Sequence, residues 1–92
     1  MSIFSGQVKI AVTGTPVQLP PNALAYGQII IQADLSNSGP VYVGPAAVTN
    51  TGGGSGNGFV LKQDRSCATK ASDTSAVWIN GNAGDWISFI AS

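Results

Sequence analysis

The sequence predicts an all-β fold, a small antiparallel β-sandwich or single jelly roll. Short runs rich in Val, Ile, Thr and aromatic residues alternate between apolar and polar positions, as strands with one buried face do. The chain also carries 12 Gly and 5 Pro, which separate these runs at short intervals. No stretch has the 3.6-residue apolar period of an amphipathic helix. With 92 residues, the chain is long enough for one such domain.

The first two strands are expected near the amino terminus. In Gln7–Thr13 the apolar residues Val8, Ile10 and Val12 share one face. Val17–Leu19 alternates in the same way, but Pro20 and the proline after it lack backbone donors. The second run is therefore predicted to be a short strand at the edge of a sheet.

The clearest strand signal is Gln28–Leu35, where every second residue from Ile29 onward is apolar. We expect this strand at the centre of a sheet. The turn formers of Asn37–Pro40 follow, and Val41–Val43 resumes an extended pattern, so these two strands are predicted to pair.

Beyond them, Gly44–Gly58 is predicted to be a mobile, exposed, glycine-rich loop. Phe59–Lys62 is a further strand candidate, and Gln63–Ser75 is a polar stretch with no strand pattern.

The last two strands are expected to form a hairpin. Ala76–Ile79 and Asp85–Ile90 flank the turn-forming segment Asn80–Gly84. Both faces of the second arm carry large apolar side chains, so one face must meet another sheet or another subunit. The candidate subunit interface consists of Trp86, Ile87, Phe89 and Ile90.

Charge and hydropathy exclude several classes of partner. The chain has four basic and four acidic residues, and charged residues make up 9% of it. Binding to nucleic acid requires a concentration of positive charge that this composition does not provide. The longest apolar runs are far shorter than the roughly 20 residues of a membrane helix. We therefore expect neither a nucleic-acid nor a membrane partner.

The sequence also offers little for catalysis or metal binding. Without any His, a Ser-His-Asp or Cys-His arrangement cannot form, and the single Cys67 cannot complete a zinc site. The four Asp lack the spacing of a calcium loop. We expect no catalytic residues, no metal and no cofactor. One alternative stays open, a small hydrolase that uses Asp64 and Asp73 as paired carboxyls.

Several motifs give the chain a resemblance to a known group. They are Thr15–Leu19 (TPVQL), Ile29–Ala33 (IIIQA), Val41–Gly44 (VYVG) and Ala83–Asp85 (AGD). In this order they resemble small structural proteins of tailed bacteriophages, over roughly residues 8 to 91. The chain departs from that pattern in its longer glycine-rich insertion at Gly44–Gly58.

The resemblance implies a virion component without enzymatic activity, a capsid decoration or cement protein. Such a protein is made in the host cytoplasm and binds the major capsid protein on the outer surface of the head. Closed rotational symmetry favours a homotrimer. Residues 1–7 are then an amino-terminal arm that docks through Ile3 and Phe4, and residues 8–92 form the β domain. The alternative is a receptor- or glycan-binding module of a head fibre or tail, with Tyr42 or Trp78 contacting sugar.

Overall fold

In the computed structural model, which describes residues 3–52, 54 and 56–92, two four-stranded antiparallel sheets confirm the predicted β-sandwich. The strands are β1 (Phe4–Lys9), β2 (Val17–Gln18), β3 (Gln28–Ala33), β4 (Val41–Gly44), β5 (Phe59–Leu61), β6 (Ser66–Lys70), β7 (Trp78–Asn80) and β8 (Trp86–Ala91). A single 3₁₀ turn, η1 (Thr74–Ala76), precedes β7. None of the helical structure in the described part of the chain is long and apolar enough to cross a membrane.

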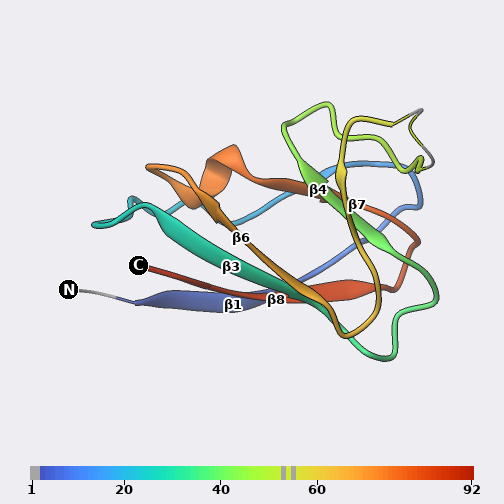
Figure 1. Cartoon of the computed structure of the whole chain (residues 1–92), viewed down its shortest axis with the longest axis horizontal. Coiled ribbons are helices and arrows are strands. Elements are labelled where there is room, and N and C mark those ends of the chain that lie inside the picture. The colour runs from blue at the N-terminus through green and yellow to red at the C-terminus, as the bar shows by residue number, and fades with distance from the viewer. Residues whose placement is uncertain (1–2, 53, 55) are drawn as a thin grey trace.

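The strand order is that of a jelly roll. Sheet A has the order β1-β8-β3-β6 and sheet B the order β2-β7-β4-β5. The first strand therefore pairs with the last, the second lies beside the seventh, the third beside the sixth and the fourth beside the fifth. This is the pattern of one long antiparallel ribbon folded over into two sheets. It places the start of β1 beside the end of β8, as Figure 1 shows.

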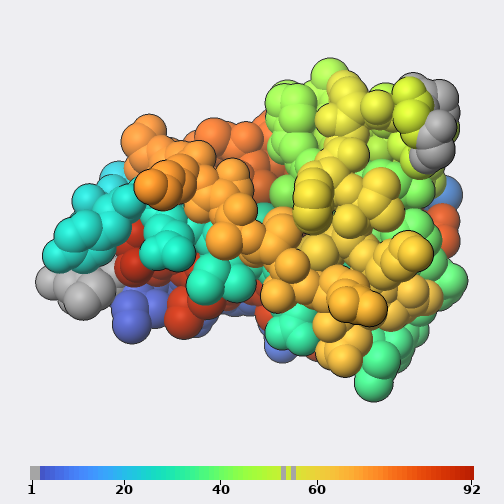
Figure 2. Space-filling view, in the orientation of Figure 1, coloured from blue at the N-terminus to red at the C-terminus, as the bar shows by residue number. Residues whose placement is uncertain are grey.

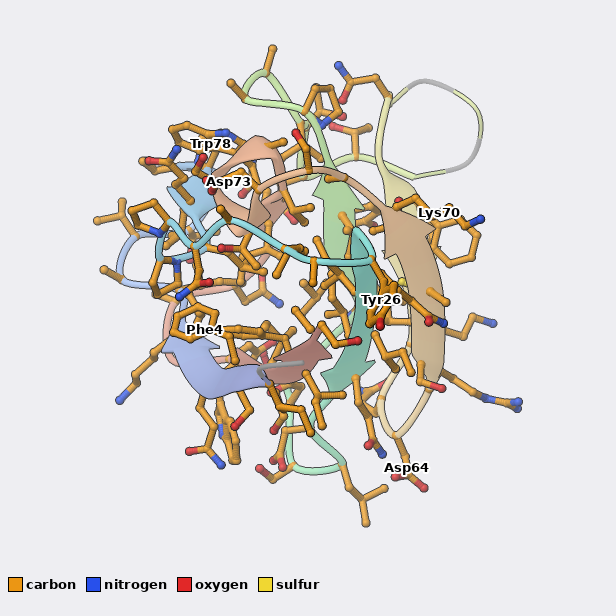
Figure 3. The ribbon with its side chains drawn as sticks, turned by 90° about the vertical axis from the view of Figure 1, so that its left-hand side faces the viewer. Phe4, Tyr26, Asp64, Lys70, Asp73 and Trp78 are labelled. Carbon is orange, nitrogen blue, oxygen red and sulfur yellow. The ribbon has the colours of Figure 1, made fainter. Side chains whose placement is uncertain are left out.

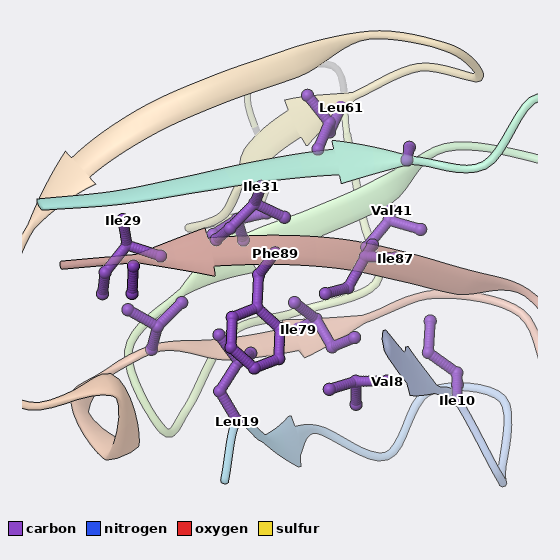
Figure 4. Close-up of a cluster of buried hydrophobic side chains, with 14 residues drawn as sticks. Val8, Ile10, Leu19, Ile29, Ile31, Val41, Leu61, Ile79, Ile87 and Phe89 are labelled. Carbon is purple, nitrogen blue, oxygen red and sulfur yellow. The ribbon is translucent and has the colours of Figure 1, made fainter. Parts of the chain in front are cut away.

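The core lies between the two sheets and explains the alternation in the sequence. Ile29 and Ile31 of β3 point inward and are fully buried, whereas Ile30 between them points outward. Ile79 of β7 and Ile87 of β8 approach from the two sheets, and Figure 4 shows them packed together with Phe89. Each fully buried side chain of this size contributes about 1.5–3 kcal/mol. Burial of these alternating residues therefore fixes the register of both sheets.

Two predictions about strand position are confirmed and two about pairing are wrong. β3 is central, between β8 and β6, and β2 is an edge strand. However, β3 and β4 lie in different sheets, and so do β7 and β8. Each connection crosses from one sheet to the other. Both sheets need strands with an apolar inner side, and the turn residues alone do not decide which strands pair.

Strand lengths and number also differ from the prediction. β1 ends at Lys9 and β3 at Ala33, so Val12 and Leu35 are exposed in loops although they continue the apolar alternation. The sequence analysis missed β6, which lies within the polar stretch Gln63–Ser75. Its inward residues are small or polar, so its alternation is weak, and its pairing with β3 holds it in place.

The described part of the glycine-rich loop folds back over the outer face of sheet B, and most of its residues are exposed or half-buried, with Val48 as the exception. Val48 is only 2% exposed. A Cβ atom at Gly58 would lie 2.7 Å from Val48 Cγ2 and 2.9 Å from Tyr42 Cβ, so a glycine is needed for this close packing. Residues 53 and 55 of the predicted loop lie outside the described residues.

Asn80 of β7 ties this loop to the sheet. Its side-chain amide donates hydrogen bonds to the carbonyl oxygen of Val48 at 3.0 Å and to that of Gly14 at 3.1 Å. Its side-chain oxygen accepts from the Gly81 N–H at 2.8 Å. Asn80 is 1% exposed, so these bonds satisfy a polar group that burial would otherwise penalise.

Candidate interaction face

The two sheets differ in how their outer faces are covered. Val48 and its loop pack on the outer face of sheet B, where Tyr42 is buried. On sheet A, Ile30 and Ile90 point away from the core and stay exposed. The chain therefore covers the outer face of sheet B in part, around Tyr42, and leaves the outer face of sheet A open.

The open face of sheet A has two rows of side chains in register across its four strands. The first row consists of Ser5, Ile90, Ile30 and Ala68. The second row consists of Gln7, Ser88, Gln32 and Ser66. We call this surface, together with Ile3, the isoleucine face. It combines a row that is apolar apart from Ser5 with a row of uncharged hydrogen-bonding groups, a mixture typical of protein interfaces.

Three isoleucines form the apolar centre of the isoleucine face. Ile3 is 66% exposed, Ile90 47% and Ile30 42%. They border a shallow hollow of about 160 Å³, which Gln28, Ala91 and Ser92 complete. Clustered exposed apolar side chains of this kind mark interaction sites more often than single ones do.

The charged groups at the isoleucine face stand at its borders, among them the Asp64 carboxylate, which accepts a hydrogen bond from Gln32 of the second row at 3.3 Å. Lys9, opposite Trp86 in the register, stands at one border. Lys70, opposite Gln28, stands at the other. Figure 3 shows Lys70 on the β6 side of the molecule and Phe4 on the β1 side. Binding through the centre of this face would therefore depend on apolar burial and hydrogen bonds more than on ion pairs.

The structure brings together residues that the sequence analysis had assigned to two separate sites. Ile3 of the predicted arm and Ile90 of the predicted subunit interface border the same hollow. Trp86 is half-buried on the outer side of β8. Ile87 and Phe89 are corrected: they are 0% and 4% exposed and belong to the core, so their side chains are not available to a second subunit.

The predicted arm is also corrected. Strand β1 begins at Phe4, so residues 4–7 belong to the β domain that was expected to begin at residue 8. Phe4 points inward, with its ring centroid 5.4 Å from that of Phe89. This tilted ring contact adds to the burial of both side chains. Ile3 precedes the strand, and residues 1 and 2 lie outside the described residues.

The paired carboxyls of the hydrolase alternative do not meet. Asp64 precedes β6 and Asp73 follows it, and the first and last residues of this strand alone are roughly 13 Å apart. Figure 3 shows the two side chains at different ends of the molecule. Glycoside hydrolysis requires two carboxyls about 5–9 Å apart, so this geometry does not support that alternative.

Each of these carboxylates has a local partner. The Asp64 oxygen accepts a hydrogen bond from the Gln32 amide at 3.3 Å. Asp73 caps η1 by accepting from the Ser75 N–H at 2.8 Å, and it also accepts from the Asn22 N–H. These hydrogen bonds, foremost that from the Ser75 backbone, lower the pKa of Asp73. In the described ranges, no group of three His, Cys, Asp or Glu side chains is placed to hold a metal ion.

Tyr42 and Cys67 are less accessible than a functional role would require. Tyr42, a candidate sugar contact, is 8% exposed beneath the glycine-rich loop, whereas Trp78 is half-buried. Cys67 is half-buried on the inner side of β6, and burial raises the pKa of its thiol. A raised pKa leaves less thiolate at neutral pH and so makes the thiol less reactive.

The sequence analysis missed Ile30 as a surface residue of interest. The signal was present, because Ile30 is an apolar residue at an outward position of an alternating strand. An apolar residue on the polar side of a strand indicates that this side has a partner or stands at an interface.

Comparisons with known proteins add little to this description. No family model and no curated protein matches the chain. Among solved structures, a protein of Bacillus endospore appendages, described as a novel family of disulfide-linked pili, is similar at 16% identity and a TM-score of 0.42. The match covers 99% of this chain and 88% of that one. A likeness at this level does not identify a function, and the resemblance to phage structural proteins stays a hypothesis.

Proposed function

We propose that this chain is a non-enzymatic structural protein that decorates the outer surface of a phage head. In this proposal identical copies, assembled as a homotrimer, bind the major capsid protein and stabilise the shell. The bare isoleucine face is the observation that supports the proposal most directly. Ile30 and Ile90 lie side by side in register on neighbouring strands, and both are exposed.

The physical demands on a cement protein fit such a face. A shell offers many identical sites, so attachment needs complementary shape, apolar contact and hydrogen bonds rather than reactive groups. Three subunits that engage at once also gain from avidity, which makes modest contacts sufficient. Jelly rolls occur in viral capsid proteins, which is a fold-level analogy in favour of the same setting.

The proposal is tested by mixing the purified protein with undecorated heads and imaging the particles. The double variant Ile30→Ser, Ile90→Ser removes the apolar centre of the isoleucine face. We expect it to lose ordered density on the shell, with binding weakened at least tenfold, or about 1.4 kcal/mol. The matched control is Val60→Ser, because Val60 is also exposed, at 41%, but belongs to sheet B.

Two results would contradict the proposal. One is the absence of ordered density with the unaltered protein at saturating concentration. The other is equal shell occupancy by the double variant and the unaltered protein. Sedimentation of the free protein tests the trimer separately, since a monomer at all concentrations contradicts that part of the proposal.

A receptor- or glycan-binding module of a head fibre or tail is the second candidate. Tyr26 favours it, because its ring is 69% exposed in the loop before β3, and jelly rolls also form lectin domains. Binding of host polysaccharide that Tyr26→Ser abolishes, without any binding to shells, would support this candidate over the first.

A further inference from the structure

The open edge of the sandwich between β6 and β5 combines three features that point to a peptide ligand. These are a free strand edge, an apolar groove and a concentration of basic side chains. In Figure 2 the segments around β5 (yellow) and β6 (orange) both lie on the visible side of the molecule. This edge lies apart from the centre of the isoleucine face.

The first feature is the free edge of β6. The Ala71 N–H donates to the Gly27 carbonyl at 2.8 Å, and the Arg65 carbonyl accepts from Ala33 at 2.9 Å. Residues 65, 67, 69 and 71 thus turn their backbone groups toward β3. Because these groups alternate along a strand, those of Ser66, Ala68 and Lys70 point away from it. β6 ends sheet A, so no strand among the described residues pairs with that edge.

The second feature is a groove of about 340 Å³ along the inner side of this edge. Cys67, Thr69 and Ala71 line it from the β6 side. Phe59 lines it from sheet B and is 60% exposed, although it stands at an inward position of β5. A strand added beside β6 would point every second side chain into this groove, where Phe59 would become covered.

The third feature is charge. Three of the four basic residues of the chain, Lys62, Arg65 and Lys70, lie between residues 62 and 70. Asp64 is the one acidic residue of that segment, so three basic residues and one acidic residue give it a net charge of +2. A segment that pairs with β6 is therefore favoured if it carries acidic side chains.

We propose that the edge of β6 and its groove bind an extended acidic segment of another protein, which adds a fifth strand to sheet A. Its backbone pairs with Ser66, Ala68 and Lys70. Its alternate apolar side chains enter the groove beside Phe59, and its acidic side chains lie near Lys70 and Arg65. Backbone pairing supplies affinity and the groove supplies selectivity, as in other cases of strand addition.

A second copy of this chain does not have the chemistry of that ligand. All four acidic residues, Asp34, Asp64, Asp73 and Asp85, lie outside the eight strands. Any strand edge that another copy offers is therefore neutral or basic. The ligand is accordingly assigned to a different protein.

The test uses a capped, fluorescent peptide in which valine alternates with glutamate and threonine. Binding is followed by fluorescence anisotropy and by the rate at which a thiol reagent modifies Cys67, which lies in the groove. We expect the peptide to bind and to slow modification of Cys67 about tenfold at saturation. A peptide of the same composition with its valines grouped together, and one with lysine in place of glutamate, should bind at least about tenfold more weakly.

Variants of the protein locate the site. Ala68→Pro removes an outward N–H while leaving the pairing with β3 in place, and proline is tolerated at such edges. Its matched control is Gln7→Pro, because Gln7 has the same outward position on the free edge of β1. Ala68→Pro should abolish binding and Gln7→Pro should leave it unchanged. Lys70→Glu should weaken binding about tenfold and Lys9→Glu should not.

Circular dichroism establishes whether each variant folds. If Ala68→Pro does not fold, Phe59→Ser provides an independent probe of the groove. The proposal is overturned if the acidic peptide fails to bind at about 1 mM. It is also overturned if Ala68→Pro binds the acidic peptide as well as the unaltered protein does. If Phe59→Ser is used instead, the same result for that variant overturns the proposal. Self-association that Ala68→Pro disrupts would reassign the edge to a second copy. None of these outcomes depends on whether the isoleucine face binds a shell.

Discussion

Asn37 and Trp86 are joined by two hydrogen bonds that imitate the pairing of two strands. The Asn37 amide nitrogen donates to the Trp86 carbonyl oxygen, and the Trp86 N–H donates to the Asn37 side-chain oxygen, each at 3.0 Å. Next to them, the Asp85 carboxylate accepts from the backbone N–H groups of Ser38 at 2.9 Å and Gly39 at 3.3 Å. Two motifs far apart in the sequence thus form one polar junction at the end of sheet A.

The first prediction concerns this junction. Asn37 is 6% exposed, and Asn37→Ala leaves the Trp86 N–H without its partner, whereas the Trp86 carbonyl oxygen still accepts from the Asp34 N–H at 3.2 Å. We expect a loss of about 1–3 kcal/mol in the free energy of unfolding, measured by urea denaturation. Asn22→Ala is the control, because Asn22 is exposed and uses only its backbone N–H to bind Asp73. Equal stability of the two variants would show that the junction contributes little.

The second prediction concerns the packing of the glycine-rich loop. Gly58→Ala places a methyl group within 3 Å of Val48 and Tyr42, so the loop must shift away from sheet B. We expect a destabilisation of about 1–3 kcal/mol and faster hydrogen exchange at Val48. In Gly39→Ala the new methyl group meets only the end of the Asn82 side chain, at 3.0 Å, which can move. Unchanged exchange at Val48 in Gly58→Ala would contradict the packing described here.

The third prediction concerns acid stability. Hydrogen bonds from Ser75 and Asn22 lower the pKa of Asp73 below its usual value of 3.8. A carboxyl whose pKa is lower in the folded state stabilises the fold above the unfolded value, and this contribution is lost as the pH falls through the folded value.

Asp73→Asn should therefore lower the unfolding midpoint near pH 7, and its effect should shrink as the pH falls through the lowered pKa of Asp73 and the carboxyl becomes protonated. Denaturation curves of both proteins across this range provide the measurement. If the unfolding midpoints of the two proteins differ by the same amount at every pH, the ionised carboxylate of Asp73 does not stabilise the fold.

The fourth prediction concerns the thiol. Burial raises the pKa of Cys67, so its alkylation at neutral pH should be slower than that of a small free thiol at the same concentration. The rate should rise with pH through a midpoint above the ordinary value of 9.0, and it should increase on unfolding in urea. Alkylation as fast as that of the free thiol would indicate that Cys67 is not shielded.

Alternation in the sequence determined which class of fold this chain adopts and which residues form much of its core. Ile29, Ile31 and Ala33 occupy the inner side of a central strand, as their spacing predicted. This succeeded because a strand with one buried face must repeat its apolar residues every two positions. The short edge strand before Pro20 was predictable for a similar local reason, the absence of backbone donors.

Strand partners and the surface sites depended on contacts between residues distant in the chain. Ile87 and Ile90 carry the same side chain, yet one is in the core and the other on the isoleucine face, and the sequence pattern of that strand is apolar on both sides. β6 owes its strand structure to β3, and its free edge follows only from its place at the end of sheet A.

The sequence by itself determined the period of the strands and the scarcity of charge, because both are properties of residues near one another in the chain. Only the tertiary structure decided which apolar side chains are covered. Coverage depends on which strands become neighbours, and that choice is made by the packing of the whole sandwich.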